Sequence, residues 1–308
     1  MKLVTFEKSG RQAIGVLDGE TIRVLDAGAN PAFASMLALI EAGDEGLEAA
    51  RKASASAATE TVGAVRLKAP VPVPVQMRDS LVFEKHLRQA RANRHLWDET
   101  ARPMKPEDVK MPQVWYDQPI YYKGNRFSVS GPEDTIIWPR GETRLDFELE
   151  LGMFIGKGGC DIAKADANEH IFGFTCFNDF SARDHQMLEG AGGLGPAKGK
   201  DFRTANAMGP CLVTRDEIGD GSGLTMIARV NGEEWARGTS SDMHHSFARI
   251  IEHVSRDEDL QPGEFIGSGT VGGGCGLELG RFLNPGDTVE LEIEGIGVLR
   301  SHIAAERR

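Results

Sequence analysis

The stretch Asp146-Phe147-Glu148-Leu149-Glu150-Leu151 alternates acidic and apolar residues with the period of a β-strand. Successive side chains of a strand point to opposite faces, so Glu148 and Glu150 should share one face. The apolar residues 152–155 that follow indicate a strand that enters the interior. Two unpaired carboxylates are costly there unless a cation lies between them. The alternative is an ordinary solvated strand face.

A third carboxylate lies in the segment Asn178-Asp179-Phe180-Ser181-Ala182-Arg183-Asp184. If Asp179 meets Glu148 and Glu150 in space, the three form an all-oxygen site for one divalent cation. Mg²⁺, Mn²⁺ and Ca²⁺ all suit such a site. No organic cofactor is expected. The GxGxxG run at residues 267–272 is not followed by a helix-forming segment, and the segment around Gly199-Lys200-Asp201 does not match a P-loop.

Composition limits the class of protein. The chain has 308 residues and a formal net charge of −11. This charge argues against a nucleic-acid or anionic-membrane partner, and no apolar run is long enough to span a bilayer. The first residues lack the apolar core of a signal peptide, and the four cysteines form no CxxC pair. We therefore expect a reduced, cytoplasmic protein.

Two domains are predicted. Residues 1–70 indicate a small N-terminal α/β domain, with strands at 3–6, 13–17 and 21–25 and helices at 32–42 and 46–54. The proline-rich residues 69–74 mark the boundary. Residues 75–308 form the second domain, with helices at 81–95 and 242–254, an Asn-Gly hairpin at 231–232 and paired strands at 289–293 and 297–303. Strands and helices do not alternate regularly, which favours a strand-rich α+β fold.

These motifs, taken in order, resemble those of the fumarylacetoacetate hydrolase family. The resemblance rests on residues 146–151 with Ile155-Gly156-Lys157, residues 177–184, Gly199-Lys200-Asp201-Phe202-Arg203-Thr204, Asn231-Gly232-Glu233 and the glycine-rich residues 267–274. It covers essentially all of residues 75–308. It implies a mixed β-roll, a homodimer and a divalent metal at the mouth of the roll.

Carried over residue by residue, the resemblance implies metal ligands at Glu148, Glu150 and Asp179, with Asp79 as a fourth. The alternative for Asp79 is a helix N-cap, because a helix is expected just after it. The resemblance also implies a catalytic dyad of His86 and Glu278, in which the carboxylate orients the imidazole.

Further roles follow from the same resemblance. Lys200 would stabilise oxyanion charge or supply a proton, and Thr204 would bond a metal-bound water or orient Lys200. The remaining candidates are substrate-binding residues, namely Arg183, Gln186, Tyr122 and Thr270. The alternative for Arg183 is a buried ion pair with Asp184 or Asp146. The glycine-rich residues 187–198 indicate a lid, or else a disordered surface loop.

The implied activity is metal-dependent hydrolysis of a C–C bond in a 1,3-diketo acid of the acylpyruvate type, in aromatic or sugar-acid catabolism. Water activated by the dyad would attack a carbonyl, and the metal would stabilise the departing enolate. Gln89 replaces the Glu of the decarboxylase branch, and Gly190 replaces a substrate-binding Tyr of the founding enzyme. The alternative is a decarboxylase, isomerase or hydratase that acts on a 2-oxo or 2-hydroxy-dienoic acid through the same enolate chemistry.

Overall fold

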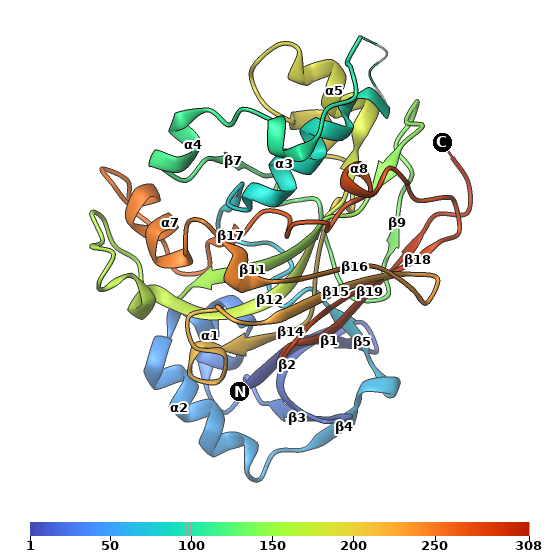
Figure 1. Ribbon diagram of the computed structural model, residues 1–308. Helices are drawn as coiled ribbons and strands as arrows, with labels where there is room; N and C mark the ends of the chain where they lie inside the picture. Colours follow the sequence, from blue (N-terminus) through green and yellow to red (C-terminus); the bar gives the residue numbers. More distant parts are fainter. Residues whose placement is uncertain (97, 99, 308) are drawn as a thin grey trace.

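A twelve-stranded mixed sheet runs through the whole molecule (Figure 1). The computed structural model describes residues 1–96, 98 and 100–307. The strand order is β4-β3-β2-β1-β14-β12-β11-β17-β6-β7, with β5 beside β1 and β8 beside β14. These strands are β1 (Lys2–Lys8), β2 (Arg11–Asp18), β3 (Thr21–Leu25), β4 (Thr59–Thr61), β5 (Arg66–Lys68), β6 (Met77–Ser80), β7 (Tyr121–Lys123), β8 (Val129–Ser130), β11 (Leu149–Ile155), β12 (Ile171–Asp179), β14 (Asn206–Thr214) and β17 (Phe265–Gly267).

Two smaller sheets complete the strand structure. A five-stranded sheet has the order β16-β15-β18-β19-β9, and β10 pairs with β13. The strands are β9 (Thr135–Ile136), β10 (Leu145–Asp146), β13 (Ser181–Ala182), β15 (Thr225–Val230), β16 (Glu233–Thr239), β18 (Thr288–Ile293) and β19 (Gly297–Ile303). The Asn-Gly hairpin is confirmed: Asn231 and Gly232 join β15 to β16 with φ angles of 52° and 81°. The strand pair β18–β19 is confirmed as well.

The helices are short. The α-helices are α1 (Met36–Glu41), α2 (Gly43–Ser54), α3 (Glu84–Ala92), α4 (Gln113–Asp117), α5 (Arg183–Gly190), α6 (Arg215–Ile218), α7 (Phe247–Val254) and α8 (Gly276–Leu279). Short 3-10 turns occur at Pro31–Phe33, Val62–Ala64, Asn93–Leu96, Pro106–Asp108, Ala167–His170, Ala197–Gly199 and Ser240–Asp242. No helix in the described part of the chain is long and apolar enough to cross a bilayer.

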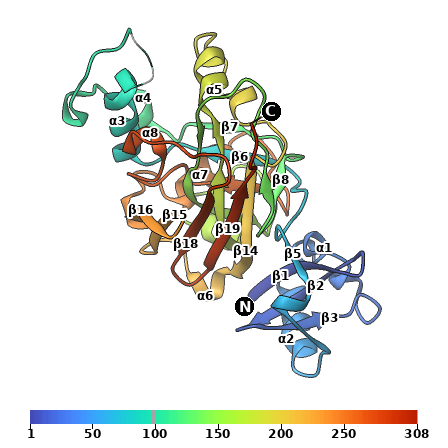
Figure 2. The ribbon, with the colours of Figure 1, turned by 90° about the vertical axis from the view of Figure 1, so that its right-hand side faces the viewer.

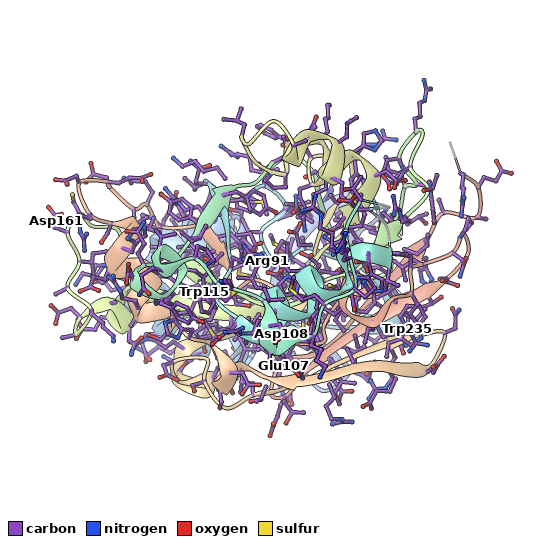
Figure 3. The ribbon with its side chains drawn as sticks, turned by 45° about the horizontal axis from the view of Figure 1, so that its top comes forward. Arg91, Glu107, Asp108, Trp115, Asp161 and Trp235 are labelled. Carbon is purple, nitrogen blue, oxygen red and sulfur yellow. The ribbon has the colours of Figure 1, made fainter. Side chains whose placement is uncertain are left out.

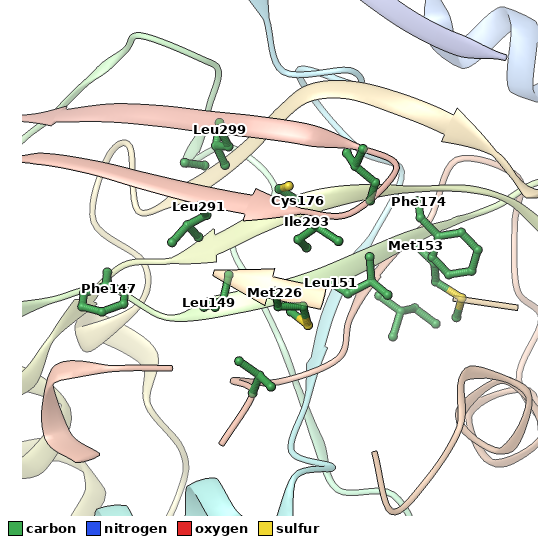
Figure 4. Close-up of a cluster of buried hydrophobic side chains, with 14 of the residues drawn as sticks. Phe147, Leu149, Leu151, Met153, Phe174, Cys176, Met226, Leu291, Ile293 and Leu299 are labelled. Atoms are coloured by element: carbon green, nitrogen blue, oxygen red, sulfur yellow. The ribbon is translucent and has the colours of Figure 1, made fainter. Parts of the chain in front are cut away.

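The main core fills the space between the twelve-stranded sheet and the five-stranded sheet (Figure 4). All seven side chains of β11 are buried, and Leu149, Leu151 and Met153 pack against residues of β15 and β18 such as Met226 and Leu291. Burial on both faces explains why the apolar run after Glu150 forms a central strand. The strand-rich α+β class is therefore confirmed.

Residues 1–70 lie together at one end of the molecule (Figure 2). Their strands are continuous with the large sheet, because β1 pairs with β14 through Lys2–Val213 and Leu3–Leu212. A second core cluster contains residues of both parts, among them Leu39, Phe172 and Phe265. The division into domains at residues 70–75 stays a prediction, and it would have to cut across this shared sheet and core.

Candidate active site

Neighbouring strands of the large sheet bring three buried carboxylates together. Asp79 lies in β6, Glu150 in β11 and Asp179 at the end of β12. The candidate ligand oxygens of these residues all lie within 4.8 Å of one another. The strands are linked in the order β12-β11-β17-β6, so facing residues of adjacent strands meet at one place. Glu150 and Asp179, two of the three carboxylates of the predicted cluster, therefore meet in space together with Asp79, the further predicted ligand.

Asp79 belongs to this cluster and does not cap a helix. It lies inside β6, where it is opposite Gly267 of β17 and Tyr122 of β7. The following helix, α3, begins only at Glu84 and is preceded by Phe83. The N-cap alternative for Asp79 is therefore wrong, and the carboxylate instead accepts a hydrogen bond of 3.2 Å from the Gly269 N–H.

The glycine-rich loop after β17 wraps around these carboxylates. The Gly269 N–H also donates to Glu150 Oε2 at 3.0 Å. A β-carbon at Gly267 would lie 2.3 Å from Asp79 Oδ1, so only glycine lets the backbone approach this closely. The loop thus accounts for the GxGxxG run without a dinucleotide.

The electrostatics of the cluster fit a divalent cation. Burial and the charge of Asp179 together raise the pKa of Asp79 to about 7. Burial and the Asp79 charge also raise the pKa of Glu150 well above its usual range. Asp179 Oδ1 is buried with no hydrogen-bond partner in the described part of the chain. Asp79, Glu150 and Asp179 could hold Mg²⁺, Mn²⁺ or Ca²⁺, because such a cation removes the repulsion and satisfies the unpaired oxygen.

Glu148 lies beside the cluster and is linked to it by Lys200. The buried Lys200 Nζ donates to Glu148 Oε2 and to Asp179 Oδ2, both at 2.6 Å. Burial would raise the pKa of Glu148, but the charges of Lys200 and Arg183 outweigh it and lower the pKa. Burial would likewise lower the pKa of Lys200, yet Asp179 and Glu148 raise it. Glu148 and Lys200 therefore remain ionised together.

Arg183 is held in a buried ion-pair network, as the alternative to a substrate-binding role predicted. Its Nε and Nη2 donate to Asp146 Oδ2 at 2.9 and 2.7 Å, and Nη2 also donates to Glu148 Oε1 at 2.7 Å. Its Nη1 donates to Gln186 Oε1 at 2.8 Å. All three guanidinium nitrogens are engaged, so Arg183 orients Glu148 and Gln186. Asp184 is not its partner, because Asp184 pairs with Arg144.

His86 and Glu278 form the predicted dyad. His86 Nδ1 lies 2.7 Å from Glu278 Oε1, and the Gly273 N–H donates to Glu278 Oε2 at 2.6 Å. Burial would lower the pKa of His86, but the charge and the hydrogen bond of Glu278 outweigh it and raise the pKa. Glu278 thus fixes the tautomer and leaves Nε2 as the basic nitrogen. The buried Cys275 lies behind the pair, with Sγ 3.9 Å from Nδ1.

One cavity joins the dyad to the carboxylates. Its volume is about 460 Å³, and His86, Asp79 and Lys200 are among the lining residues. Its lining includes residues of α3, α5 and α8, and these helices gather with α4 at one end of the molecule (Figure 1). Figure 3 looks onto that end, with Arg91 of α3 and Trp115 of α4 labelled.

Three further predicted residues differ in their placement. Tyr122 lines the cavity and donates to Asp179 Oδ2 at 2.7 Å, so it supports a candidate ligand. Thr270 also lines the cavity, with Oγ1 3.4 Å from Glu150 Oε1. Thr204 does not line it: its Oγ1 accepts a hydrogen bond from the Ile137 N–H, in a backbone conformation with φ of 77°. The geometry does not support a role for Thr204 at the metal.

The sequence analysis missed the apolar side of the cavity. Leu81, Leu87, Ile120, Leu194 and Leu277 line it together with the polar residues. They come from five separate segments, and each is an ordinary apolar residue in its own segment. No local pattern marks them, so only the fold shows that they share a surface.

Residues 79–304 match the family described as fumarylacetoacetate (FAA) hydrolase, C-terminal. The chain belongs to the fumarylacetoacetate hydrolase family. This match contains every candidate site residue named above. It confirms the family that the order of the motifs predicted.

Similar proteins carry different names. Oxaloacetate tautomerase YisK of Bacillus subtilis is 31% identical over 320 residues, covering 98% of this chain and all of that protein. Mitochondrial oxaloacetate tautomerase FAHD2A of Bos taurus is 39% identical over 183 residues, which are 59% of this chain and 58% of that protein. The structure of a fumarylacetoacetate hydrolase from the psychrophilic Exiguobacterium antarcticum is 28% identical, with a TM-score of 0.76 over 99% of this chain and 100% of that chain. The mixed fold expected from the family is therefore confirmed.

Proposed function

We propose that this protein is a divalent-metal-dependent enzyme that enolises a 2-oxo acid. The observation that carries this proposal is the presence of a carboxylate cluster and a His–Glu dyad in and around one cavity. A divalent cation held by Asp79, Glu150 and Asp179 would polarise the 2-oxo carbonyl and make the C3 protons more acidic. The candidate ligand atoms are all carboxylate oxygens, so Mg²⁺ or Mn²⁺ could bind there.

The protein's own residues then handle the proton and the charge. His86 Nε2 takes a proton from C3 of the substrate, while Glu278 holds Nδ1–H and stabilises the imidazolium. Lys200 carries a permanent positive charge at the carboxylate end of the cavity. Its ammonium group stabilises the negative charge that develops on the enolate oxygen.

Keto–enol tautomerisation is the reaction that we favour. One proton leaves C3 and another is delivered to the C2 oxygen, so the mass of the substrate does not change. The names of two relatives, both oxaloacetate tautomerases, support this choice. The sequence analysis favoured a hydrolase and gave an isomerase, the class to which a tautomerase belongs, as one of the alternatives.

Hydrolysis of a C–C bond is the second candidate, and the geometry of the dyad favours it. A His oriented by a carboxylate at 2.7 Å can deprotonate water as readily as a carbon acid. In an acylpyruvate, the hydroxide would add to the C4 carbonyl and the C3–C4 bond would break. C3 would then take up a proton, and the products would be a carboxylic acid and pyruvate.

One product screen distinguishes the two reactions. Metal-stripped protein, with Mg²⁺ or Mn²⁺ added back, is incubated with oxaloacetate, phenylpyruvate and acetylpyruvate. We expect the enol absorbance to reach its equilibrium value faster with protein and metal than with metal alone, at unchanged mass, and we expect this acceleration to be lost in His86→Ala. Formation of two acids from acetylpyruvate would instead establish hydrolysis. Metal binding without conversion of any substrate would refute the proposed function.

A further inference from the structure

The cavity lining contains both polar and apolar residues. Asp79, Glu148, Glu150 and Lys200 are polar members, and the 2-oxo acid head would bind at their carboxylates. Most of the exposed cavity surface is nevertheless apolar. Leu81, Leu87, Ile120, Leu194 and Leu277 supply it, together with Tyr121. The part of a substrate that extends away from the carboxylates must contact this surface.

Every cationic group in the described cavity lining already has an acidic partner. Arg183 is bonded through its three nitrogens to Asp146, Glu148 and Gln186. Lys200 is bonded to Glu148 and Asp179, and His86 is paired with Glu278. A second carboxylate on a substrate would therefore meet a mostly apolar surface and no unpaired cation among the described lining residues.

We infer that the substrate is a 2-oxo acid whose substituent beyond C3 is uncharged and apolar. The inference rests on the proposed function, since it assumes that the 2-oxo acid head binds at the carboxylate cluster. An ionised carboxylate transferred from water to an apolar surface without a partner is strongly disfavoured. Apolar substituents gain instead, by roughly fourfold in affinity for each methylene group that is fully buried. The inferred substrate therefore differs from oxaloacetate, the substrate that the names of two relatives give.

A matched pair of substrates tests the inference. Oxaloacetate and phenylpyruvate are both 2-oxo acids that enolise at C3, but one carries a carboxylate there and the other a phenyl ring. We expect kcat/KM for metal-dependent tautomerisation to be at least about tenfold higher for phenylpyruvate, since a buried ring removes far more apolar surface from water. An equal or higher value for oxaloacetate would overturn the inference and leave the proposed function intact. Turnover of neither substrate by the metal-bound protein would refute the proposed function, and the inference with it.

Leu194 offers a variant that does not threaten the fold. Its side chain is 98% exposed, yet it lines the cavity. Leu194→Lys places a cation among the apolar lining residues, and Leu194→Gln is the uncharged control. We expect Leu194→Lys to shift the kcat/KM ratio toward oxaloacetate about fivefold relative to Leu194→Gln, the effect of one partly exposed ion pair. The same ratio in both variants would overturn the assignment of these apolar residues to the substituent.

Discussion

Asp146 accepts hydrogen bonds from both halves of the site. Its Oδ2 accepts from the Arg183 guanidinium, which in turn holds Glu148. Its two oxygens also accept from the Gly276 and Leu277 N–H groups, at the start of the short helix that carries Glu278. Asp146 therefore fixes the dyad and the metal-side carboxylate relative to each other without contacting substrate.

Asp146→Asn tests this positioning role. The amide keeps the shape but loses the charge that holds Arg183, so Glu148 and Glu278 should both lose their alignment. Glu148 is also a predicted metal ligand, so we expect a 10- to 100-fold loss of Mn²⁺ affinity, the usual effect of removing a residue that orients a ligand, and a shifted pH profile of kcat. Calorimetric metal titration and pH–rate profiles measure the two effects. Asp184→Asn, at the neighbour of Arg183 that pairs with Arg144 instead, is the control, and unchanged metal affinity in Asp146→Asn would refute the role.

The carboxylate cluster also predicts a stability effect of the metal. A ligand that binds only the folded state at 100 times its Kd stabilises that state by about 2.7 kcal/mol. We expect Mn²⁺ at that concentration to increase the free energy of unfolding, measured with urea, by this amount. Asp179→Asn should abolish it, because this change removes the charge of a carboxylate whose buried Oδ1 has no partner in the described part of the chain. Equal stabilisation of both proteins would place the cation elsewhere.

Single residues were predictable where a local pattern carried the information. The alternation in residues 146–151 predicted a shared face for Glu148 and Glu150, and both residues lie in the cavity lining. Arg183 was harder, because substrate binding and a buried ion pair use the same guanidinium. The placement of Thr204 could not be predicted from its motif, because its hydroxyl accepts a hydrogen bond from the Ile137 N–H, which is distant in the sequence.

At the scale of elements, the strand periodicity was a better guide than the helix boundaries. Residues 21–25 form β3 with the expected bounds. The helix expected at 242–254 begins only at Phe247, because the Ser246 side chain caps it by accepting from the Arg249 N–H. The helix expected at 81–95 begins at Glu84, because Leu81 remains extended and its N–H donates to the Ile120 carbonyl. Local propensity does not reveal such long-range partners.

The start of α5 predicts an acid-dependent stability. Burial would raise the pKa of Asp184, but hydrogen bonds from Thr143 and from the Arg144 guanidinium lower it to about 2. A depressed carboxylate pKa stabilises the fold above the unfolded-state pKa of about 3.9, and this contribution is lost as the pH falls toward 2. Asp184→Asn should therefore cost about 2 kcal/mol at pH 7 by linkage and progressively less below pH 4. Urea unfolding at pH 7, 4 and 3 measures this, and a pH-independent difference would contradict it.

At the scale of the whole molecule, the N-terminal residues and the catalytic part share one sheet. The β1–β14 pairing and the second core cluster join them. All four tryptophans lie beyond residue 75, so their fluorescence reports only the second part, whereas far-ultraviolet circular dichroism reports both. We expect the two signals to change together during urea unfolding. Separate transitions would show that residues 1–70 unfold independently.

The central claim is that this fold holds a metal and a His–Glu dyad so that a 2-oxo acid enolises. Exchange of the C3 protons of phenylpyruvate and of oxaloacetate with deuterium in D₂O, followed by NMR, measures enolisation directly, whether or not a C–C bond later breaks. For at least one of these substrates we predict exchange that requires protein and Mn²⁺ together, that exceeds the rate with Mn²⁺ alone, and that is lost in His86→Ala. If the metal-bound protein exchanges neither substrate faster than Mn²⁺ alone does, the claim is contradicted.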